Sequence, residues 1–265
     1  MSPDTEIREL MDSAVTLARE AGRVTLRHFG DVVESEAKGD GSPVTIADRE
    51  AESLLRDRIT RQYPDHGVLG EEFGETEGAG RVRWILDPID GTRSFMRGVP
   101  LYAVLIGIER DDVPVVGVAH FPALAETVWA GRGEGAFWRP AGSRIDVPAS
   151  VNGTRELKEA VALTSDPGMT ASSQFGPGWG RLTAAVGYTR SWGDAYGHAL
   201  VATGRAELMV DPELSAWDAA PLLTILAEAG GRFTDLSGAA TIHGGSGLSS
   251  NGPLHSEALK LLSDR

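Results

Sequence analysis

The nonapeptide at positions 84–92, WILDPIDGT, constrains the fold and the chemistry of this chain more than any other stretch. The largely apolar residues 82–86 suit a short buried strand. Asp87 and Asp90 follow them, with Pro88 in between, and proline continues neither a helix nor a central strand. The sequence therefore predicts a tight turn at the mouth of a strand, on which the two carboxylates converge.

Two neighbouring carboxylates allow two interpretations. They repel each other unless a cation neutralises them, and oxygen ligands suit hard cations such as Mg2+. Gly91 and Thr92 lead into a predicted helix at 93–96, whose free backbone N–H groups suit a phosphate. The segment is either a site for a metal ion and a phosphate, or an Asp-Pro turn with a helix-capping aspartate.

Two further motifs accompany the nonapeptide. Gly70-Glu71-Glu72 follows a strand-like run at 67–69, and Trp217-Asp218 lies just before an apolar helical stretch. The three motifs follow one another in the order G-E-E, W-[IV]-[IL]-D-P-[IL]-D-G-T and W-D. In these motifs and their order the chain resembles the inositol monophosphatase family of metal-dependent sugar-type phosphatases, and the resemblance covers nearly its whole length. The nonapeptide is highly specific, whereas each of the other two motifs is weak alone.

The resemblance implies a layered α-β-α-β-α phosphatase fold with two or three Mg2+. The implied metal ligands are the carboxylates of Glu71, Asp87, Asp90 and Asp218 and the backbone carbonyl of Ile89. In two-metal hydrolysis one ion activates water, and another, about 4 Å away, stabilises the leaving oxygen. Haloacid-dehalogenase-type phosphatases carry D-x-D-G-[TV]; they are excluded because D-P-I-D-G-T is one residue too long.

The resemblance also implies catalytic partners for the metal ligands. Glu71 is expected to orient the attacking water together with Thr92, whose hydroxyl would pair with Asp48. Asp48 also lies in the first turn of a predicted helix with a capping-box-like start, and the two roles are compatible. Lys38, in the loop 38–43, is expected near the metals and the phosphate; the alternative for this segment is a plain hairpin loop.

The expected substrate-binding residues lie in both halves of the chain: Asp90, Gly91, Thr92, Gly193, Asp194, Ala195 and Asp211. The pattern R-x-[WY]-G-D-x-[YF] at 190–196 is similar to that of the histidinol-phosphate phosphatase branch. Asp194 and Asp211 as a pair suit an amine or an imidazolium, and histidinol phosphate carries an amine and an imidazole. On local grounds alone, Asp194 is equally well interpreted as the N-cap of the next helix.

These observations together predict a Mg2+-dependent histidinol-phosphatase, a phosphoric monoester hydrolase that acts on L-histidinol phosphate in histidine biosynthesis. The competing enzyme is an inositol-1-monophosphatase or a broad-specificity sugar or polyol phosphatase. A non-enzymatic alternative is a regulatory protein that binds the transcription machinery. The family further leads us to expect a homodimer.

Composition narrows the class of protein. The net charge of −13 disfavours nucleic-acid binding, and the absence of cysteine excludes disulfides and thiolate metal sites. We find no apolar run long enough to cross a bilayer and no signal peptide at the N-terminus, so we expect no membrane partner and a cytoplasmic location. A bound divalent cation would reconcile the negative charge with an anionic small-molecule phosphate monoester.

The expected fold class is α+β with an α/β second half. Residues 1–148 are expected to form an N-terminal α+β subdomain with an antiparallel sheet and most metal ligands. Residues 149–265 would form a C-terminal α/β subdomain with the substrate-selecting residues and the last metal ligand. Apart from the helix at 93–96, the predicted helices are 6–29, 45–62, 179–186, 194–202, 216–229 and 254–262; the predicted strands are 31–37, 67–69, 82–86, 101–109, 113–121, 127–131, 135–138, 144–147, 159–164, 188–191, 207–210, 232–235 and 248–251.

Overall fold

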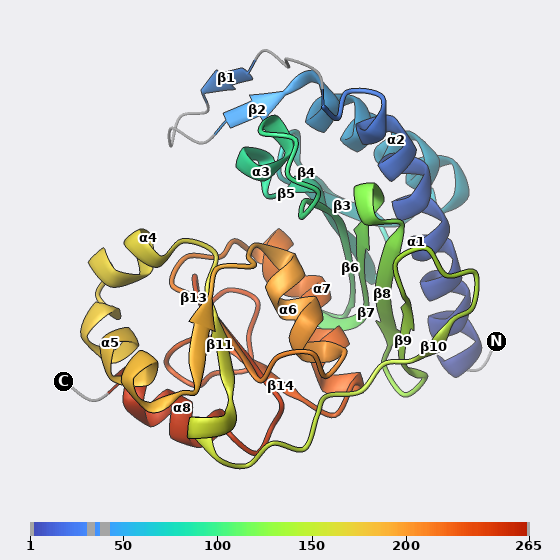
Figure 1. The fold of residues 1–265 in the computed structure, drawn as a ribbon. Helices are drawn as coiled ribbons and strands as arrows, with labels where there is room; N and C mark the ends of the chain where they lie inside the picture. The colour runs from blue at the N-terminus through green and yellow to red at the C-terminus, as the bar shows by residue number, and fades with distance from the viewer. Residues whose placement is uncertain (1–2, 31–34, 38–42, 264–265) are drawn as a thin grey trace.

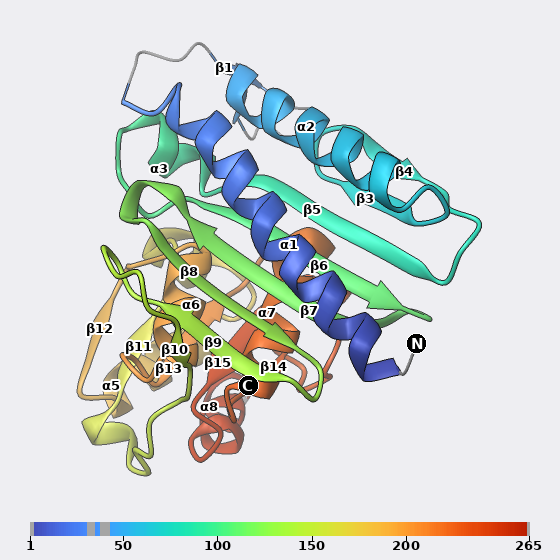
Figure 2. The ribbon, with the colours of Figure 1, turned by 90° about the vertical axis from the view of Figure 1, so that its right-hand side faces the viewer.

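The computed structural model describes residues 3–30, 35–37 and 43–263. Helices and sheets are stacked in five layers, in the order helix, sheet, helix, sheet, helix (Figure 1; Figure 2). This confirms the layered α-β-α-β-α fold that the sequence predicts. Within the described ranges, no helix is both long and apolar enough to cross a membrane.

An eight-stranded sheet forms the second layer. Its strands are β3 (Gly67–Gly70), β4 (Gly74–Thr76), β5 (Val82–Asp90), β6 (Ala103–Arg110), β7 (Val113–Phe121), β8 (Glu126–Gly131), β9 (Gly135–Arg139) and β10 (Val147–Pro148). Their spatial order is β10-β9-β8-β7-β6-β5-β3-β4, and all pairs are antiparallel except β3 and β5. Because β3 and β5 are parallel and Gly70 lies beside Leu86, the residues that follow them, Glu71 and Asp87, meet at one edge of the sheet.

Helices α1 (Pro3–Leu26) and α2 (Ile46–Gln62) cover the outer face of this sheet (Figure 2). The apolar residues at helical spacing in the predicted helix are buried: Leu10, Ala14, Leu17, Ala18, Ala21 and Val24. The short antiparallel pair of β1 (Ser35–Ala37) and β2 (Pro43–Thr45) precedes α2. The predicted capping box begins α2: Asp48 accepts the Thr45 N–H (2.9 Å), and the Thr45 hydroxyl accepts a hydrogen bond from the backbone in return.

The inner face of the large sheet packs on helices α6 (Ala195–Ala202) and α7 (Ala216–Glu228), which form the third layer. The fourth layer is a five-stranded sheet of β11 (Val161–Leu163), β12 (Tyr188–Arg190), β13 (Leu208–Asp211), β14 (Arg232–Thr234) and β15 (Gly247–Ser250), in the order β12-β11-β13-β15-β14. Helices α5 (Gly176–Ala185) and α8 (His255–Ser263) cover its outer face, with α4 (Pro167–Ser172) beside α5 (Figure 1). A single buried apolar cluster joins both sheets through the third layer.

The tight turn predicted after residue 86 is wrong. Strand β5 continues through Asp87 and Pro88 to Asp90, and its pairing with β6 shifts register between Asp87 and Asp90. Such an irregularity tolerates proline, because the unpaired residue does not have to donate a hydrogen bond to the neighbouring strand. Gly91, with a φ of +78°, ends the strand and begins the short helix α3 (Thr92–Met96).

Most other predicted elements are confirmed within a few residues of their expected ends. The sequence pattern did not predict β4, α4 or the short 3-10 helices Pro122–Leu124 and Leu157–Glu159, and the strand expected at 144–147 is reduced to β10. Part of the strand expected at 31–37, and Lys38 with the loop that follows it, lie outside the described residues. The subdomain boundary between residues 148 and 149 stays a prediction.

Candidate active site

Three carboxylates converge at the C-terminal end of β5. Asp87 and Asp90 come from β5 itself, and Asp218 comes from the first turn of α7. One carboxylate oxygen of each residue lies within 4.8 Å of those of the other two. Backbone amides hold all three in place: Ile89 N–H donates to Asp87 Oδ1 (2.9 Å), Ala195 N–H to Asp90 Oδ2 (2.8 Å) and Ser215 N–H to Asp218 Oδ2 (2.7 Å).

Burial and mutual repulsion raise the pKa of each of these carboxyl groups. Burial is the largest cause for Asp87 and Asp90, whose pKa values lie well above the ordinary range, and the neighbouring carboxylates add to it. Burial also raises the pKa of Asp218, to about 7. These acids are costly to ionise together unless a cation neutralises them, and they offer only oxygen atoms as ligands. Both properties fit a hard divalent cation such as Mg2+.

Glu71 lies beside this cluster. It follows β3, and its backbone N–H donates to the Leu86 carbonyl of β5 (3.1 Å). Burial is the largest cause of the raised pKa values of Asp87, Asp48 and Asp218, and the charge of Glu71 raises all three further. The structure therefore brings together all four carboxylates that were predicted as metal ligands, from β3, β5 and α7.

The expected hydrogen bond between Thr92 and Asp48 is not among the contacts of the described residues. The Thr92 hydroxyl donates instead to the Ile89 carbonyl (3.1 Å), three residues earlier, because Thr92 is the first residue of α3. Asp48 Oδ2 is taken up by the capping box of α2, where it accepts the Thr45 hydroxyl (2.5 Å). The buried Asp48 Oδ1 has no partner within the described part of the chain, so the catalytic pairing stays a prediction.

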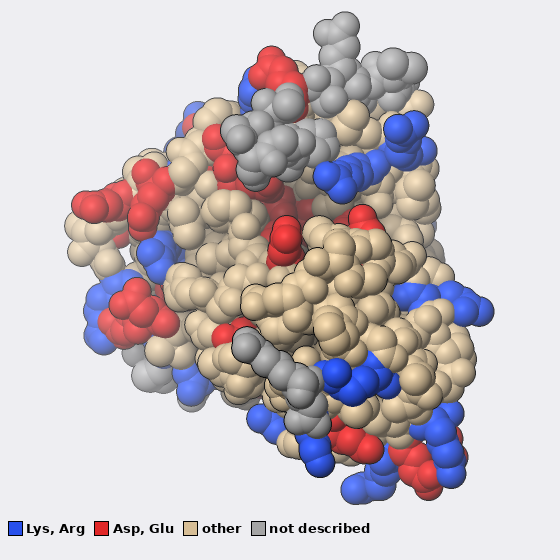
Figure 3. Space-filling model, turned by 90° about the vertical axis from the view of Figure 1, so that its left-hand side faces the viewer, with Lys and Arg blue, Asp and Glu red and all other residues tan. Residues whose placement is uncertain are grey.

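A cavity of about 180 Å3 is lined by members of this cluster and by a second group of acids. Asp90 and Asp218 belong to the cluster, and the other lining side chains include the acids Asp194, Asp211 and Glu213 and the apolar residues Met169, Leu214 and Leu222. Acidic side chains gather in and around a hollow on the face of the molecule that Figure 3 shows. The same cavity thus contacts predicted metal ligands and both acids predicted to select the substrate.

Asp194 points into this cavity and does not cap the helix that it precedes. It occupies the N-cap position of α6, yet its side chain makes no capping hydrogen bond. Its carboxylate lies against Gly91, where an added Cβ would be 2.6 Å from Asp194 Oδ2. Burial first, and then the charge of Asp211, raises the pKa of Asp194. The helix-capping alternative for this side chain is therefore wrong.

Asp211 is held from two sides. Its Oδ1 accepts the Ser165 N–H (3.1 Å), and its Oδ2 lies 3.1 Å from Nε2 of the fully buried His198. The other ring nitrogen of His198 lies 2.6 Å from the Ser249 hydroxyl. Gly193 fits against Ser165 because an added Cβ would overlap that residue. Asp211 is consequently a fixed carboxylate at the end of β13.

The sequence reasoning missed several residues that line the cavity: Ser165, Met169, His198, Glu213 and Leu214. Glu213 could have been predicted from the sequence, because a carboxylate two positions after Asp211 extends the same acidic pattern. His198 had no such signal, since a histidine within an apolar helix is most often a structural residue. Met169 lies on α4, which the pattern did not predict.

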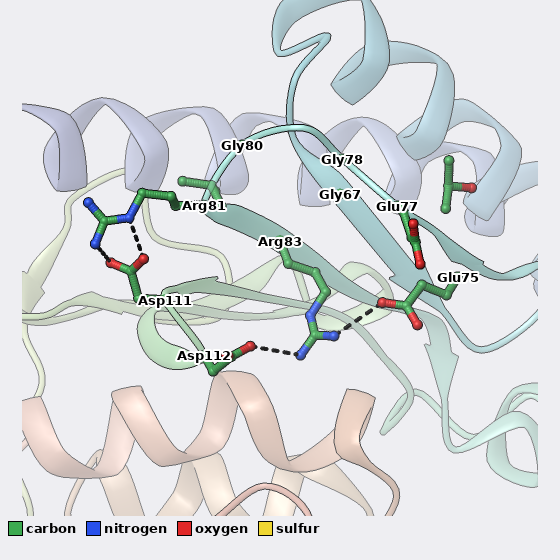
Figure 4. A pocket seen from close by; sticks show the side chains of 11 residues that line it. Gly67, Glu75, Glu77, Gly78, Gly80, Arg81, Arg83, Asp111 and Asp112 are labelled. Atoms are coloured by element: carbon green, nitrogen blue, oxygen red, sulfur yellow. Dashed lines mark hydrogen bonds and ion pairs between the residues drawn. The ribbon is translucent and has the colours of Figure 1, made fainter.

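A larger hollow, of about 330 Å3, lies at the opposite end of β5 (Figure 4). Its two arginines already pair with acids: Arg81 with Asp111, and Arg83 with Glu75 (3.2 Å) and Glu109 (2.6 Å). Because these guanidinium groups are neutralised on the protein, the hollow is a poor site for a phosphate.

Comparison with known proteins agrees with this geometry. A sequence model of the inositol monophosphatase family matches residues 6–264. The histidinol-phosphatase of Chlorobaculum parvum is 42% identical over 252 residues, which cover 94% of this chain and 92% of that protein. The inositol-1-monophosphatase of Caulobacter vibrioides is 36% identical over 257 residues, covering 94% and 98%. The crystal structure of the extragenic suppressor protein suhB from Bartonella henselae superposes with a TM-score of 0.88 at 30% identity, covering 97% of this chain and 99% of that one.

Proposed function

The chain belongs to the inositol monophosphatase family and is a phosphomonoesterase, and we propose that its substrate is L-histidinol phosphate. The reaction releases L-histidinol and phosphate, a step of histidine biosynthesis. One observation carries the proposal: a single cavity is lined both by members of the metal-type carboxylate cluster and by two further acids, Asp194 and Asp211. A phosphate ester with a cationic end matches both.

The lining residues outside the cluster are chemically suited to the histidinol group. An ammonium or imidazolium forms charge-assisted hydrogen bonds with carboxylates, and Asp194, Asp211 and Glu213 supply them. Met169, Leu214 and Leu222 offer apolar contacts to the faces of an imidazole ring. A second phosphate would meet the like charge of these acids, which argues against bisphosphate substrates.

The chemistry at the carboxylate cluster depends on divalent cations, for which we propose two or three Mg2+. The residues that would hold them are Glu71, Asp87, Asp90 and Asp218, with the Ile89 carbonyl. When bound, Mg2+ lowers the pKa of water and neutralises phosphate oxygens.

The remaining roles fall to the protein itself. Glu71 orients the attacking water, with help from Asp48 and Thr92. Backbone N–H groups of Gly91 and Thr92 bind phosphate oxygens, while Asp194 and Asp211 fix the alcohol portion. Ala195 contributes through its N–H, which orients Asp90. Lys38 stays a prediction, as do the homodimer and the cytoplasmic location.

The second candidate substrate is inositol 1-phosphate, supported by the 36% identical relative named inositol-1-monophosphatase. The hydroxyl groups of a neutral polyol can donate to the same ionised carboxylates, but a polyol has no positive charge with which to form an ion pair with them. A regulatory role in transcription would be additional to catalysis. A pull-down from lysate, repeated with an Asp218→Asn variant, would separate that role from turnover.

The substrate proposal predicts a selective effect of Asp194→Asn. We expect KM for L-histidinol phosphate to rise about tenfold, near 1.4 kcal/mol, and KM for inositol 1-phosphate to change less than about twofold. Asp166→Asn is the matched control, because Asp166 caps α4 near the cavity without lining it, and asparagine caps equally well. Equal effects of Asp194→Asn on both substrates would contradict the proposed role of this carboxylate.

A further inference from the structure

The carboxylate of Glu52 is completely buried on α2, outside the acidic cluster. Its exposed fraction is 0%. Glutamate is almost never buried to this degree unless it is paired, because burial of an uncompensated charge is very costly. The groups that compensate the charge therefore indicate its role.

Glu52 holds the segment that follows β3. Its Oε2 accepts the Glu72 N–H (2.8 Å), and its Oε1 accepts the Phe73 N–H (3.2 Å). Arg56, one turn further along α2, donates from Nε to Glu52 Oε1 (2.7 Å). The Arg56 guanidinium also donates to the Gly74 carbonyl and the Thr76 hydroxyl. The two side chains thus attach backbone 72–76 to α2.

The glycine of the G-E-E motif belongs to the same arrangement. An added Cβ at Gly70 would overlap the Glu52 carboxylate, so a larger residue at this position would displace it. Glu71 lies between Gly70 and Glu72. Its backbone is fixed on one side by its N–H bond to the Leu86 carbonyl and on the other by the bond from Glu72 to Glu52.

We propose that Glu52 is a positioning residue that holds Glu71 in the orientation needed to bind a divalent cation. The inference rests on the proposed function, in which Glu71 is a metal ligand. A ligand whose backbone is fixed before the ion arrives loses less conformational freedom on binding. Residues that orient metal ligands typically change metal affinity or activity 10- to 100-fold when they are replaced.

The test is a Mn2+ titration without substrate, followed by the electron paramagnetic resonance signal of the free ion. Glu52→Gln keeps the size of the side chain and one acceptor, but turns an N–H donor toward a group that also donates. We expect the Mn2+ dissociation constant of Glu52→Gln to rise about tenfold or more. We also expect kcat to fall and to recover partly at high Mg2+.

Glu109→Gln is the matched control. Glu109 is 2% exposed and accepts a hydrogen bond from Arg83 Nη2 (2.6 Å), so its replacement also breaks a buried ion pair. It lies on β6 and shares Arg83 with Glu75 (3.2 Å), but the hydrogen bonds from the Glu72 and Phe73 amides go to Glu52 and do not involve it. We expect Glu109→Gln to lower Tm as Glu52→Gln does, while the Mn2+ dissociation constant stays at the wild-type value.

Hydrogen exchange of the wild-type protein provides a readout that does not depend on how well a variant folds. We expect the Glu72 and Phe73 amides to be protected, although the residue Phe73 is 49% exposed, and Glu52→Gln to remove that protection. Rapid exchange of these amides in the wild type would overturn the inference.

Glu71→Gln separates this inference from the proposed function. If Glu71→Gln weakens Mn2+ binding and Glu52→Gln does not, Glu52 is structural only and the inference fails alone. If Glu71→Gln binds Mn2+ like the wild type, the proposed ligand set fails, and the inference fails with it.

Discussion

Replacing Asp218 by asparagine will stabilise the metal-free protein and abolish its phosphatase activity. Burial is the largest cause that raises the pKa of Asp218 to about 7, from an ordinary value of 3.8. A carboxyl group whose pKa is raised by folding binds more protons in the folded state than in the unfolded state. The free energy of unfolding therefore falls as pH rises from about 4 to about 7, and asparagine, which stays neutral, escapes this loss.

The size of the gain follows from the pKa shift. A rise of about 3 pKa units corresponds to about 4 kcal/mol at neutral pH. Because the Asp218 side chain is only partly buried, solvent screens part of the repulsion, and we expect about half of this value. For a chain of this size, about 2 kcal/mol raises Tm by roughly 4–8 °C. Asparagine keeps the acceptor for the Ser215 N–H, so the start of α7 is preserved.

The assay is thermal unfolding in EDTA at pH 7.5 and at pH 5, with phosphate release in Mg2+ measured in parallel. The gain in Tm should be larger at pH 7.5, where the wild-type carboxyl is ionised. Asp235→Asn is the control of opposite sign: hydrogen bonds from the Ser237 and Ala239 N–H groups to Asp235 Oδ1 (both 2.9 Å) outweigh burial and lower the pKa of Asp235, so replacing the ionised carboxylate by a neutral amide should lower Tm. A Tm gain that is absent, or equal at both pH values, would refute the electrostatic reasoning, and retained turnover would refute the ligand assignment.

Further predictions concern the metal, the glycine beside the cluster and a buried histidine. Mg2+ added to the wild type should raise Tm more at pH 7.5 than at pH 5, because protons compete with it for the carboxylates; no stabilisation at either pH would count against a metal site. Gly91→Ala should cost about 1–2 kcal/mol and lower kcat/KM at least tenfold, because Gly91 has a φ of +78° and the added Cβ would lie 2.6 Å from Asp194 Oδ2; wild-type Tm and activity would contradict this. Burial lowers the pKa of His120 to about 4 from 6.5, so stability should be lost as pH falls from about 6.5 to about 4, by about 2 kcal/mol at pH 5. Urea unfolding of His120→Gln at pH 7.5 and pH 5 should lack this part of the pH dependence.

Local patterns in the sequence were sufficient for much of the fold. The helical spacing of apolar residues in α1 and the capping box of Thr45 and Asp48 each depend on neighbours within a few positions, and both are confirmed. The bulge at Pro88 could not be predicted from local sequence patterns. Whether a proline ends a strand or lies in a bulge depends on the partner strand, and the pairing of β5 with β6 decides it.

The site shows the same limit. The order of the three motifs was enough to name the four carboxylates that meet beside β5. The orientation of single side chains was not predictable, because it depends on contacts between distant segments. Asp194 faces the cavity, and the Thr92 hydroxyl turns to Ile89. Asp211 is held by two residues from other elements: Ser165 follows the neighbouring strand β11, and His198 lies on α6.

The most direct test of the proposed substrate is kcat/KM for phosphate release in Mg2+ across a panel of esters. The panel contains L-histidinol phosphate, inositol 1-phosphate, fructose 1,6-bisphosphate and 3′-phosphoadenosine 5′-phosphate. We predict a preference for L-histidinol phosphate of about a hundredfold, near 2.7 kcal/mol, because the acids Asp194 and Asp211 line the cavity. A flat profile, or a preference for inositol 1-phosphate, would contradict the proposed substrate and leave the carboxylate cluster as the site of a broader phosphatase.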